Sequence, residues 1–295
     1  EIGAEDLVIL DIRSPDEYVV GHIPGSLNEP FVTAFDPLTG PSSNWIVGEA
    51  KEGGLWGLWL EVPKSSDLFE TLGNLGITKD SRVVIVTAPN PNPEAEPPFY
   101  GLANGTRVAF TLIYAGVKNV ALLDGGYPKW LAEDKETDTE IPEVAAIPYH
   151  GKVNKAMFVS RQQVKKSIRK ADILDARDAD VYFGVTIEPF AEKPGHIPSA
   201  KCLPAPWIWL MEEDGNYLYK DTDTLRAIAS GVLRDSWGRC WDRSQEIIVY
   251  CGVGGYASSW WFVLTQVLGY QNVKLYDGAA QEWVKYYDMV PYQWE

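Results

Sequence analysis

The chain has 295 residues, 45% of them hydrophobic, and a formal net charge of −15 at pH 7. This length is typical of about two domains. So acidic a chain is repelled by phosphate backbones, and nucleic acid is therefore not expected as a partner. No run approaches the roughly 20 apolar residues of a membrane-spanning helix, so no such span is expected. An anionic substrate would have to find a local positive site against the overall charge.

The three cysteines, Cys202, Cys240 and Cys251, are too few for a disulfide framework and lack the spacing of metal ligands. We therefore expect neither a bound metal nor a cofactor. Cys202 is predicted to be buried. A disulfide between Cys240 and Cys251 would give Cys240 a resolving role, but no motif positions it for one.

The first predicted element is a strand beginning at Val8, and the sequence around it recurs in the second half of the chain. The run VILDIRSPDEYVVGHIPGS matches ILDARDADVYFG, from Ile173, and the GHIPSA that follows it. Further along, VVIVT at Val83 matches IIVYC at Ile247, and LIYAGVKNVALLDGGYPKW matches VLTQVLGYQNVKLYDGAAQEW. Such self-similarity indicates two copies of one fold.

Each copy contains a strand, a helix and a second strand in succession. In the first copy VVIV (83–86) is followed by a helical segment, TRVAFTLIYAG (106–116), and then by VALL (120–123). The second copy has IIVY, YASSWWFVLTQVLG and VKLY in the same order. Short β-branched runs bounded by turn residues are typical of buried strands. The order predicts right-handed crossovers, and therefore two α/β domains, each with a parallel sheet flanked by helices on both faces.

The charged and then proline-containing stretch 132–155 has little periodicity and is predicted to be a linker. It separates an N-terminal domain, 1–131, from a C-terminal domain, 156–295. In the second copy FVSRQQVKKSIRKA predicts a helix capped by Ser160. The first copy has only seven residues before VILDIR and starts at Glu1 rather than Met, so we expect a longer precursor. Removal of an export signal and truncation both explain this start, and an exported or periplasmic location is favoured over the cytoplasm.

The clearest chemical signal is IIVYCGVGGYASSWW. Cys251 stands at the carboxyl end of a predicted buried strand, where open α/β sheets bind their ligands. Gly252, Gly254 and Gly255 allow a tight loop whose backbone N–H groups point inward, and a helix begins just after it. Such a ring of donors stabilises a thiolate, so the pKa of Cys251 is expected to fall below the ordinary value of about 8.5. A thiolate there is suited to attack sulfane sulfur and to hold the resulting persulfide.

The motifs resemble those of the tandem-domain rhodaneses, the family of thiosulfate and 3-mercaptopyruvate sulfurtransferases. The first half carries the resemblance in DIRSPDEYVVGHIPGS and LLDGGYPKW, and the second half in DARDADVYFG, GHIPSA, CGVGGYAS and LYDGAAQEW. The resemblance spans almost the whole chain and implies two rhodanese-like domains, a non-catalytic first and a catalytic second that uses Cys251. The counterpart of Cys251 in the first copy is Thr87, followed by Ala88 and Pro89 instead of a glycine loop, which agrees with this assignment.

The substrate site departs from the pattern of family members that use thiosulfate. Such members usually carry a cationic or hydroxyl residue in the loop, where this chain has Val253 and Tyr256, and many carry an arginine at the position of Val181. Thiosulfate is therefore expected to be a weak donor. The predicted substrate-binding residues are Val181, Gly252, Val253, Gly254, Gly255 and Tyr256.

Other polar and aromatic residues near these motifs have structural interpretations. Arg177 is predicted to form an ion pair with the aspartate two residues before it. His22 and His196 occupy matching GHIP turns in both copies, which favours a role in the turn. Trp260, just after the glycine loop, is predicted to line the mouth of the pocket. The proline-rich insert 88–105 is interpreted as a variable surface loop.

Three functions compete for this site. In the first, an enzyme, Cys251 takes sulfur from a small sulfur-containing donor, and a thiol or cyanide acceptor removes it. In the second, a carrier holds sulfur or selenium and hands it only to a protein acceptor. The third, a cysteine-dependent phosphatase, needs an arginine about six residues after the cysteine. Ala257 stands there, and no Arg or Lys falls between Cys251 and Lys274. We reject the third function and favour the first.

Overall fold

A computed structural model of the protein describes residues 2–37, 39–49, 57–90, 98–233 and 244–295. The chain divides into two compact units. The first domain comprises residues 1–155 and 211–218, and the second comprises 156–210 and 219–295. Cys240 and part of the predicted insert, 91–97, lie outside the described residues.

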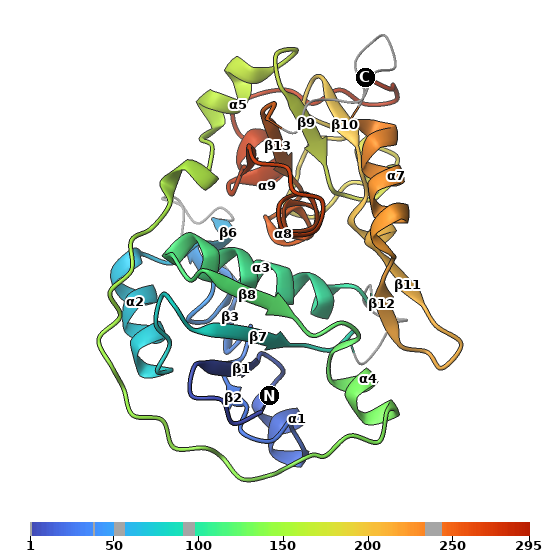
Figure 1. Ribbon diagram of the computed structural model, residues 1–295. Coiled ribbons are helices and arrows are strands. Elements are labelled where there is room, and N and C mark those ends of the chain that lie inside the picture. Colours follow the sequence, from blue (N-terminus) through green and yellow to red (C-terminus); the bar gives the residue numbers. More distant parts are fainter. Residues whose placement is uncertain (1, 38, 50–56, 91–97, 234–243) are drawn as a thin grey trace. The chain divides into compact units, whose positions relative to one another are not determined.

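The first domain is built on a four-stranded parallel sheet in the order β2-β1-β7-β8 (Figure 1). Helices cover it on both faces: α3 packs on β7 and β8 with α2 beside it, and α4 packs on the opposite face with Tyr127 and Trp130 against Ile9. The strands and helices are β1 (Leu7–Asp11), α1 (Pro15–Val20), β2 (Leu27–Asn28), α2 (Ser65–Asn74), β7 (Arg82–Val86), α3 (Tyr100–Ala115), β8 (Asn119–Leu122) and α4 (Gly126–Ala132).

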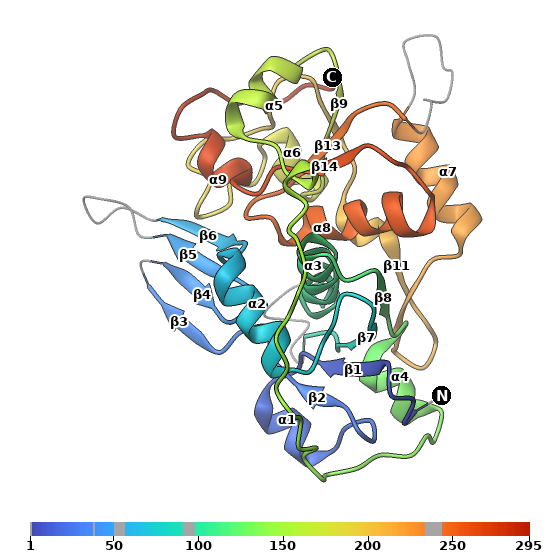
Figure 2. The same cartoon turned by 60° about the vertical axis from the view of Figure 1, so that its left-hand side comes forward.

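Between β2 and α2 the chain forms two antiparallel pairs of short strands, which Figure 2 shows side by side next to α2. The pairs are β3 (Ala34–Asp36) with β4 (Gly40–Ser42), and β5 (Val47–Glu49) with β6 (Leu58–Glu61). The sequence did not predict these hairpins, because strands of three or four residues leave too little periodicity to detect.

The second domain repeats the four-stranded parallel sheet, in the order β10-β9-β13-β14. α8 covers one face, and α5 and α9 contribute to the core on the other. Its helices and strands are α5 (Arg161–Ser167), β9 (Asp172–Asp175), α6 (Ala179–Phe183), β10 (Ala200–Cys202), α7 (Thr222–Val232), β13 (Ile247–Tyr250), α8 (Gly255–Phe262), β14 (Val273–Leu275) and α9 (Ala279–Trp283). Between β10 and α7 the chain forms a strand pair, β11 (Trp209–Met211) with β12 (Tyr217–Tyr219), of which residues 211–218 belong to the first unit. Short 3-10 turns lie at Lys155–Met157 and Ala205–Ile208, and one π-helical turn follows α8 at Val263–Val267.

The two sheets agree in register as well as in order. Asp11 pairs with Val86 in the first sheet, and Asp175 pairs with Tyr250 in the second. Thr87 and Cys251 therefore follow equivalent strand ends. The predicted α/β architecture, with two copies of one parallel-sheet fold, is confirmed.

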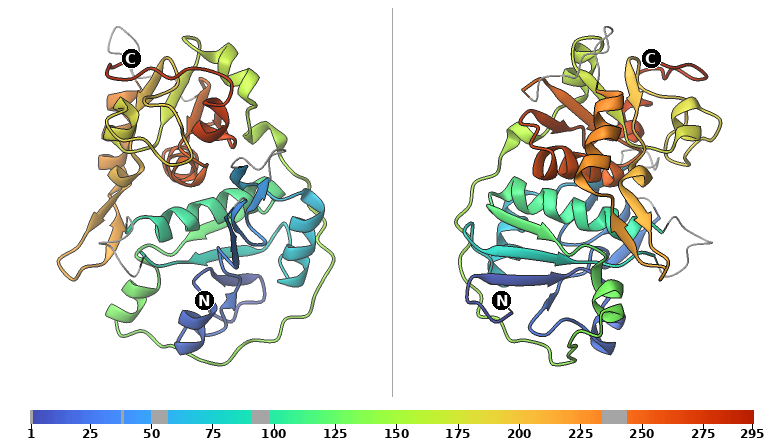
Figure 3. Two further views of the ribbon diagram at one scale, coloured as in Figure 1. Left: turned by 180° about the vertical axis from the view of Figure 1, so that it is seen from behind. Right: turned by 45° about the vertical axis from the view of Figure 1, so that its right-hand side comes forward.

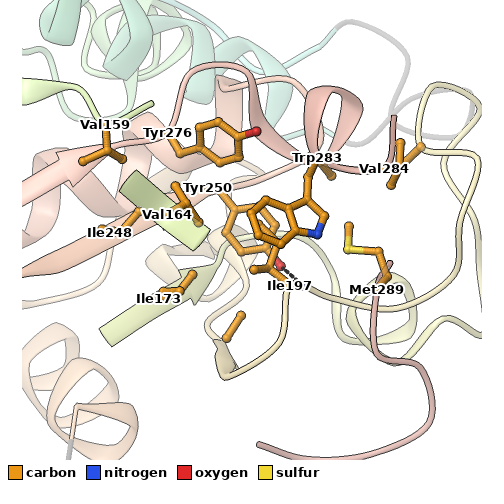
Figure 4. Packing of buried hydrophobic residues seen from close by; sticks show 13 residues of the cluster. Val159, Val164, Ile173, Ile197, Ile248, Tyr250, Tyr276, Trp283, Val284 and Met289 are labelled. Atoms are coloured by element: carbon orange, nitrogen blue, oxygen red, sulfur yellow. Dashed lines mark hydrogen bonds between the residues drawn. The ribbon is translucent and has the colours of Figure 1, made fainter. Parts of the chain in front are cut away.

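The core of the second domain sits between the sheet and α9. Figure 4 shows Ile173, Ile248 and Tyr250 of the sheet packed with Val164 of α5 and Trp283 of α9. Ile247 and Val249 of β13 alternate with Ile248 and Tyr250 and are also buried, but they lie outside this cluster, so both faces of the strand are apolar, as a sheet covered on both sides requires. The Tyr250 hydroxyl accepts a hydrogen bond from the backbone N–H of Ile197 at 2.9 Å, which fixes the end of β13 just before Cys251.

Two predicted helices can be compared directly with the structure. Ser160 caps α5, and its side chain and that of Gln163 bond each other's backbone N–H groups, so the predicted cap is confirmed. The helix of the first copy begins at Tyr100 and not at Thr106, because LANG continues the helical path despite its glycine and asparagine. The predicted insert is correspondingly shorter on its C-terminal side.

The predicted linker contains no helix or regular strand over 133–154, and Figure 3 follows it along the outside of the first domain. It is held there by backbone contacts: Asp138 bridges to His22, and the N–H of Ile147 donates to the carbonyl of Gly73 at 2.9 Å. Domain limits at 131 and 156 remain a proposal.

One position near the second sheet carries backbone strain that can be tested. Ala279 has φ 51°, in the left-handed region that favours glycine, whereas its counterpart in the first domain is Gly126, with φ 56°. Ala279→Gly is expected to raise the free energy of unfolding by about 1 kcal/mol. Ala280→Gly, one residue further into α9, should lower it by about 1 kcal/mol. Urea denaturation of both variants checks this, and a loss of stability in Ala279→Gly would contradict it.

Candidate active site

Cys251 follows the last residue of β13 and is buried, with 2% of its surface exposed. The next residues turn sharply into α8. Gly254 adopts φ 92°, which a residue with a side chain adopts at a cost, and its N–H donates to the Cys251 Sγ at 3.1 Å. The backbone N–H groups of Val253 and Ala257 act on the same thiol. The glycine-rich sequence thus does form a loop of N–H donors around the sulfur.

The prediction that the pKa of Cys251 falls below its ordinary value is wrong. Burial raises the pKa of Cys251 to about 11, and the carboxylate of Glu188 acts in the same direction. The N–H groups of Ala257, Val253 and Gly254 lower the pKa but do not offset the loss of water around the sulfur. Near neutral pH the thiolate is therefore the minor form of Cys251, despite the backbone donors.

Glu188 is the residue at this site that the sequence analysis missed. Its carboxylate lies over the cysteine loop: a Cβ atom at Gly252 would be 2.7 Å from Oε1 and 2.8 Å from Oε2, and 2.5 Å from Cε2 of Phe190. Only a glycine fits under these side chains in this arrangement. Burial raises the pKa of Glu188 to about 7.

A signal for Glu188 is present in the repeat. In the first domain Tyr18 and His22 are four residues apart, and in the second Tyr182 and His196 are fourteen apart. Both tyrosines stack on their histidine at 3.8 Å, so the two pairs are equivalent. The second domain therefore has a loop ten residues longer at this point, and that loop carries Glu188.

A buried ion pair supports the strand end beneath the site. Arg177 Nη2 lies 2.6 Å from Asp175 Oδ2, and Nε donates to Oδ1 at 2.9 Å. The Tyr250 hydroxyl donates to Asp175 at 2.6 Å, and Arg177 Nη1 lies 3.4 Å from Glu188 Oε2. The structural role predicted for Arg177 is confirmed. Most of its charge is directed at Asp175, so Glu188 is only partly neutralised.

The remaining predicted site residues are more dispersed. Val253 and Tyr256 are half-buried in and just after the loop, and Val181 is 9% exposed on α6. A role for these three in substrate binding stays a prediction. Trp260 is fully buried in α8 and its indole N–H donates to the carbonyl of Pro204, so it belongs to the core and does not line a pocket mouth.

The first domain has no thiol at the equivalent position. The hydroxyl of Thr87 donates to the carbonyl of Gly101 at 2.5 Å, in the first turn of α3. A cavity of about 170 Å³ lies beside it, lined in part by Arg13 and Asn90. Arg13 is paired with Asp11 as Arg177 is with Asp175. The scaffold of the site is retained there without its nucleophile.

The two histidines of the GHIP turns and Cys202 have structural surroundings. The two ring nitrogens of His22 lie 2.9 Å and 3.1 Å from the carbonyl oxygens of Tyr18 and Glu140, and Nδ1 of His196 lies 3.0 Å from the carbonyl oxygen of Tyr182. Cys202 is buried, as predicted, and burial raises its pKa to about 12.

Two further features of the described residues bear on other functions. Across the described ranges, no group of three or more His, Cys, Asp or Glu side chains is arranged to hold a metal ion. None of the helices within those ranges combines the length and apolarity needed to cross a membrane.

The raised pKa of Cys251 should be visible in the pH dependence of its alkylation. In a Cys202→Ser, Cys240→Ser background, the rate of alkylation by iodoacetamide should rise about tenfold per pH unit from pH ~6 to ~9.5 without a plateau, because the thiolate is the nucleophile and stays the minor form. Following alkylation by mass spectrometry checks this. A plateau below about pH 8.5 would mean that the N–H donors dominate after all.

The fold and this cysteine loop together define a class of protein. Residues 1–133 and 160–286 each match the rhodanese-like domain, so the chain belongs to the rhodanese-like family, with two such domains in tandem.

Two curated relatives are similar to this chain over most of its length. A protein of Mycobacterium leprae (strain TN) named "Putative thiosulfate sulfurtransferase" is 30% identical over 281 residues, covering 90% of this chain and 91% of that protein. The "Sulfur carrier protein TtuD" of Thermus thermophilus is 31% identical over 226 residues, which cover 71% of this chain and 70% of the relative. The family and these names support sulfur transfer.

Solved structures show the same fold at low identity. An EanB variant with a cysteine persulfide, in a tetrahedral intermediate state with ergothioneine, superposes with a TM-score of 0.73 at 20% identity. The match covers 98% of this chain and 66% of the EanB chain. Wild-type EanB gives a TM-score of 0.72, again at 20% identity, and 65% of its length is covered.

Proposed function

We propose that this protein is a sulfurtransferase in which Cys251 carries sulfane sulfur, as a persulfide, from a small donor to a thiol or cyanide acceptor. The observation that carries the proposal is the position of Cys251 at the carboxyl end of a central parallel strand, with the Gly254 N–H directed at its sulfur. The repeat supplies an internal comparison, since the first domain keeps the scaffold and has Thr87 there.

The reaction proceeds in two displacements. The Cys251 thiolate attacks the outer sulfur of the donor, a new S–S bond forms, and the bond from that sulfur to the rest of the donor breaks. For thiosulfate the leaving group is sulfite, which takes the electron pair. The loop N–H groups stabilise the persulfide anion. A thiolate or cyanide then attacks the outer sulfur, and Cys251 leaves as the thiolate.

Thiosulfate is proposed to be a weak donor. Val253 and Tyr256 provide no positive charge, and Arg177 is engaged by Asp175. A lost charge-assisted hydrogen bond typically costs about 1.5–3 kcal/mol, or roughly one to two orders of magnitude in affinity. Donors that carry less charge should be used more efficiently.

A second candidate is a carrier that loads sulfur or selenium once and releases it only to a protein acceptor. Two observations support a carrier: the near-complete burial of Cys251 and the similarity to a protein named as a sulfur carrier. Both candidates use the same persulfide, and they differ in what removes it.

The two candidates separate in a turnover assay. Protein at about one-hundredth of the donor concentration is incubated with a sulfane-sulfur donor and cyanide, and thiocyanate is counted per mole of protein. An enzyme yields many equivalents. Loading of Cys251 followed by no more than one equivalent of thiocyanate would favour the carrier, and absence of loading with every donor would reject both.

A further inference from the structure

The loop between α6 and β10 brings a carboxylate to the cysteine loop, and this carboxylate has no part in the chemistry described above. Glu188 lies close enough to Gly252 that no side chain fits between them, and Gly252 is bonded directly to Cys251. Its side chain is 22% exposed, so it is accessible from the solvent side of the site while most of it is withdrawn from water.

The charges around Glu188 are predominantly negative. Four titratable groups interact with it electrostatically. Three come from the end of β9 and the turn after it, namely Asp175, Arg177 and Asp178, and the fourth is Cys251, which follows β13. Arg177 is the one cation in this set, and its shortest contact is to Asp175, at 2.6 Å, against 3.4 Å to Glu188. An anion that approaches the Cys251 sulfur therefore meets a carboxylate whose charge is only partly offset.

The repeat indicates that this arrangement belongs to the site and not to the fold. The first domain has the same Asp–Arg pair, the same stacked Tyr–His pair and the same strand order. It lacks both the cysteine and the ten extra residues between Tyr18 and His22 that would carry a counterpart of Glu188. The carboxylate and the nucleophile occur together in the second domain.

We propose that Glu188 is a specificity-determining residue of the Cys251 site: its carboxylate discriminates against doubly charged donors such as thiosulfate and reserves the persulfide chemistry for sulfane-sulfur donors of lower negative charge. This inference rests on the proposed function. Coulomb repulsion from one carboxylate acts on a dianion twice as strongly as on a monoanion at the same distance.

Discrimination against doubly charged donors should increase as pH rises, because Glu188 then loses its proton. Burial raises the pKa of Glu188 to about 7. Below that value Glu188 is largely protonated and neutral, so it does not repel a dianion. Above it the carboxylate is charged, and discrimination is complete.

The test compares two donors that react in the same way but differ by one charge. Thiosulfate and the methanethiosulfonate anion each give up an outer sulfur, and they release sulfite and methanesulfinate respectively. With cyanide as the common acceptor, the ratio of their kcat/KM values cancels the ionisation of Cys251 and of cyanide. The protein is assayed as wild type, as Glu188→Gln and as Glu192→Gln, an exposed glutamate on the same loop that serves as the matched control.

In the wild type the thiosulfate-to-methanethiosulfonate ratio should fall as pH rises through about 7, over a range of about 5.5 to 8.5. At pH ~8, Glu188→Gln should raise kcat/KM about tenfold for thiosulfate and about threefold for the monoanion, and its ratio should not vary with pH. Glu192→Gln should match the wild type.

Contrary outcomes separate this inference from the proposed function. A pH-independent ratio in the wild type, or equal gains for both donors in Glu188→Gln, would overturn the role of Glu188 while sulfur still loads onto Cys251. The pH dependence of the ratio in the wild-type protein tests the role of Glu188 even when a variant folds poorly. Failure of these two and every other sulfane-sulfur donor to load sulfur onto Cys251 in any form of the protein would overturn the proposed function itself, and this inference with it.

Discussion

Cys251→Ser is expected to lower the rate of thiocyanate formation about a thousandfold or more, because a serine hydroxyl neither ionises near neutral pH nor forms a persulfide. The substitution exchanges one small buried group for another, so the fold should be kept. Thiocyanate formation from a sulfane-sulfur donor and cyanide measures the loss.

Cys202→Ser is the matched control, since Cys202 is the other buried thiol among the described residues of the second domain. It should keep the rate within a few-fold of the wild type. If Cys251→Ser retained a tenth of the wild-type rate or more, or if Cys202→Ser were the inactive variant, the assignment of the nucleophile would be wrong.

Arg177→Met should lower the free energy of unfolding of the second domain by about 3–5 kcal/mol, because it leaves the Asp175 carboxylate buried without its cation. Asp175 also receives the Tyr250 hydroxyl at the end of β13, so sulfur transfer should fall along with stability. Urea denaturation followed by tryptophan fluorescence measures the first effect.

Arg226→Met, on α7 of the same domain, provides the control for this change. Arg226 pairs with Asp223 on the surface, with side chains 44% and 91% exposed, and such pairs contribute about 1 kcal/mol or less. Similar midpoints for Arg177→Met and Arg226→Met would show that the buried pair does not hold the strand end.

The fold could be predicted from the sequence because the signals for it are local and occur twice. β-Branched runs before turns mark β7 and β13, and the glycines after Cys251 mark the turn into α8. The repeat then fixes the equivalence of Thr87 and Cys251 without any three-dimensional information. The hairpins between β2 and α2 escaped prediction because their strands are too short to show alternation.

The electrostatics of the site could not be predicted in the same way. The glycine loop indicates donors for a thiolate, but the cost of burying Cys251 depends on residues that pack on it from elsewhere in the chain. Glu188 is more than sixty residues away in sequence and reaches Gly252 only because the longer loop after α6 folds back. Trp260 shows the same limit: its place in the helix was predictable, but the core that buries it was not.

The role of Cys251 as the sulfur carrier is tested most directly by locating the sulfur after loading. The protein is incubated with methanethiosulfonate without an acceptor, alkylated, digested, and its cysteine peptides are weighed by mass spectrometry. The peptide containing Cys251 should gain the mass of one sulfur atom, and those containing Cys202 and Cys240 should not. Sulfur on either of those peptides with none on Cys251, or no gain on any peptide with this or any other sulfane-sulfur donor, would contradict this role.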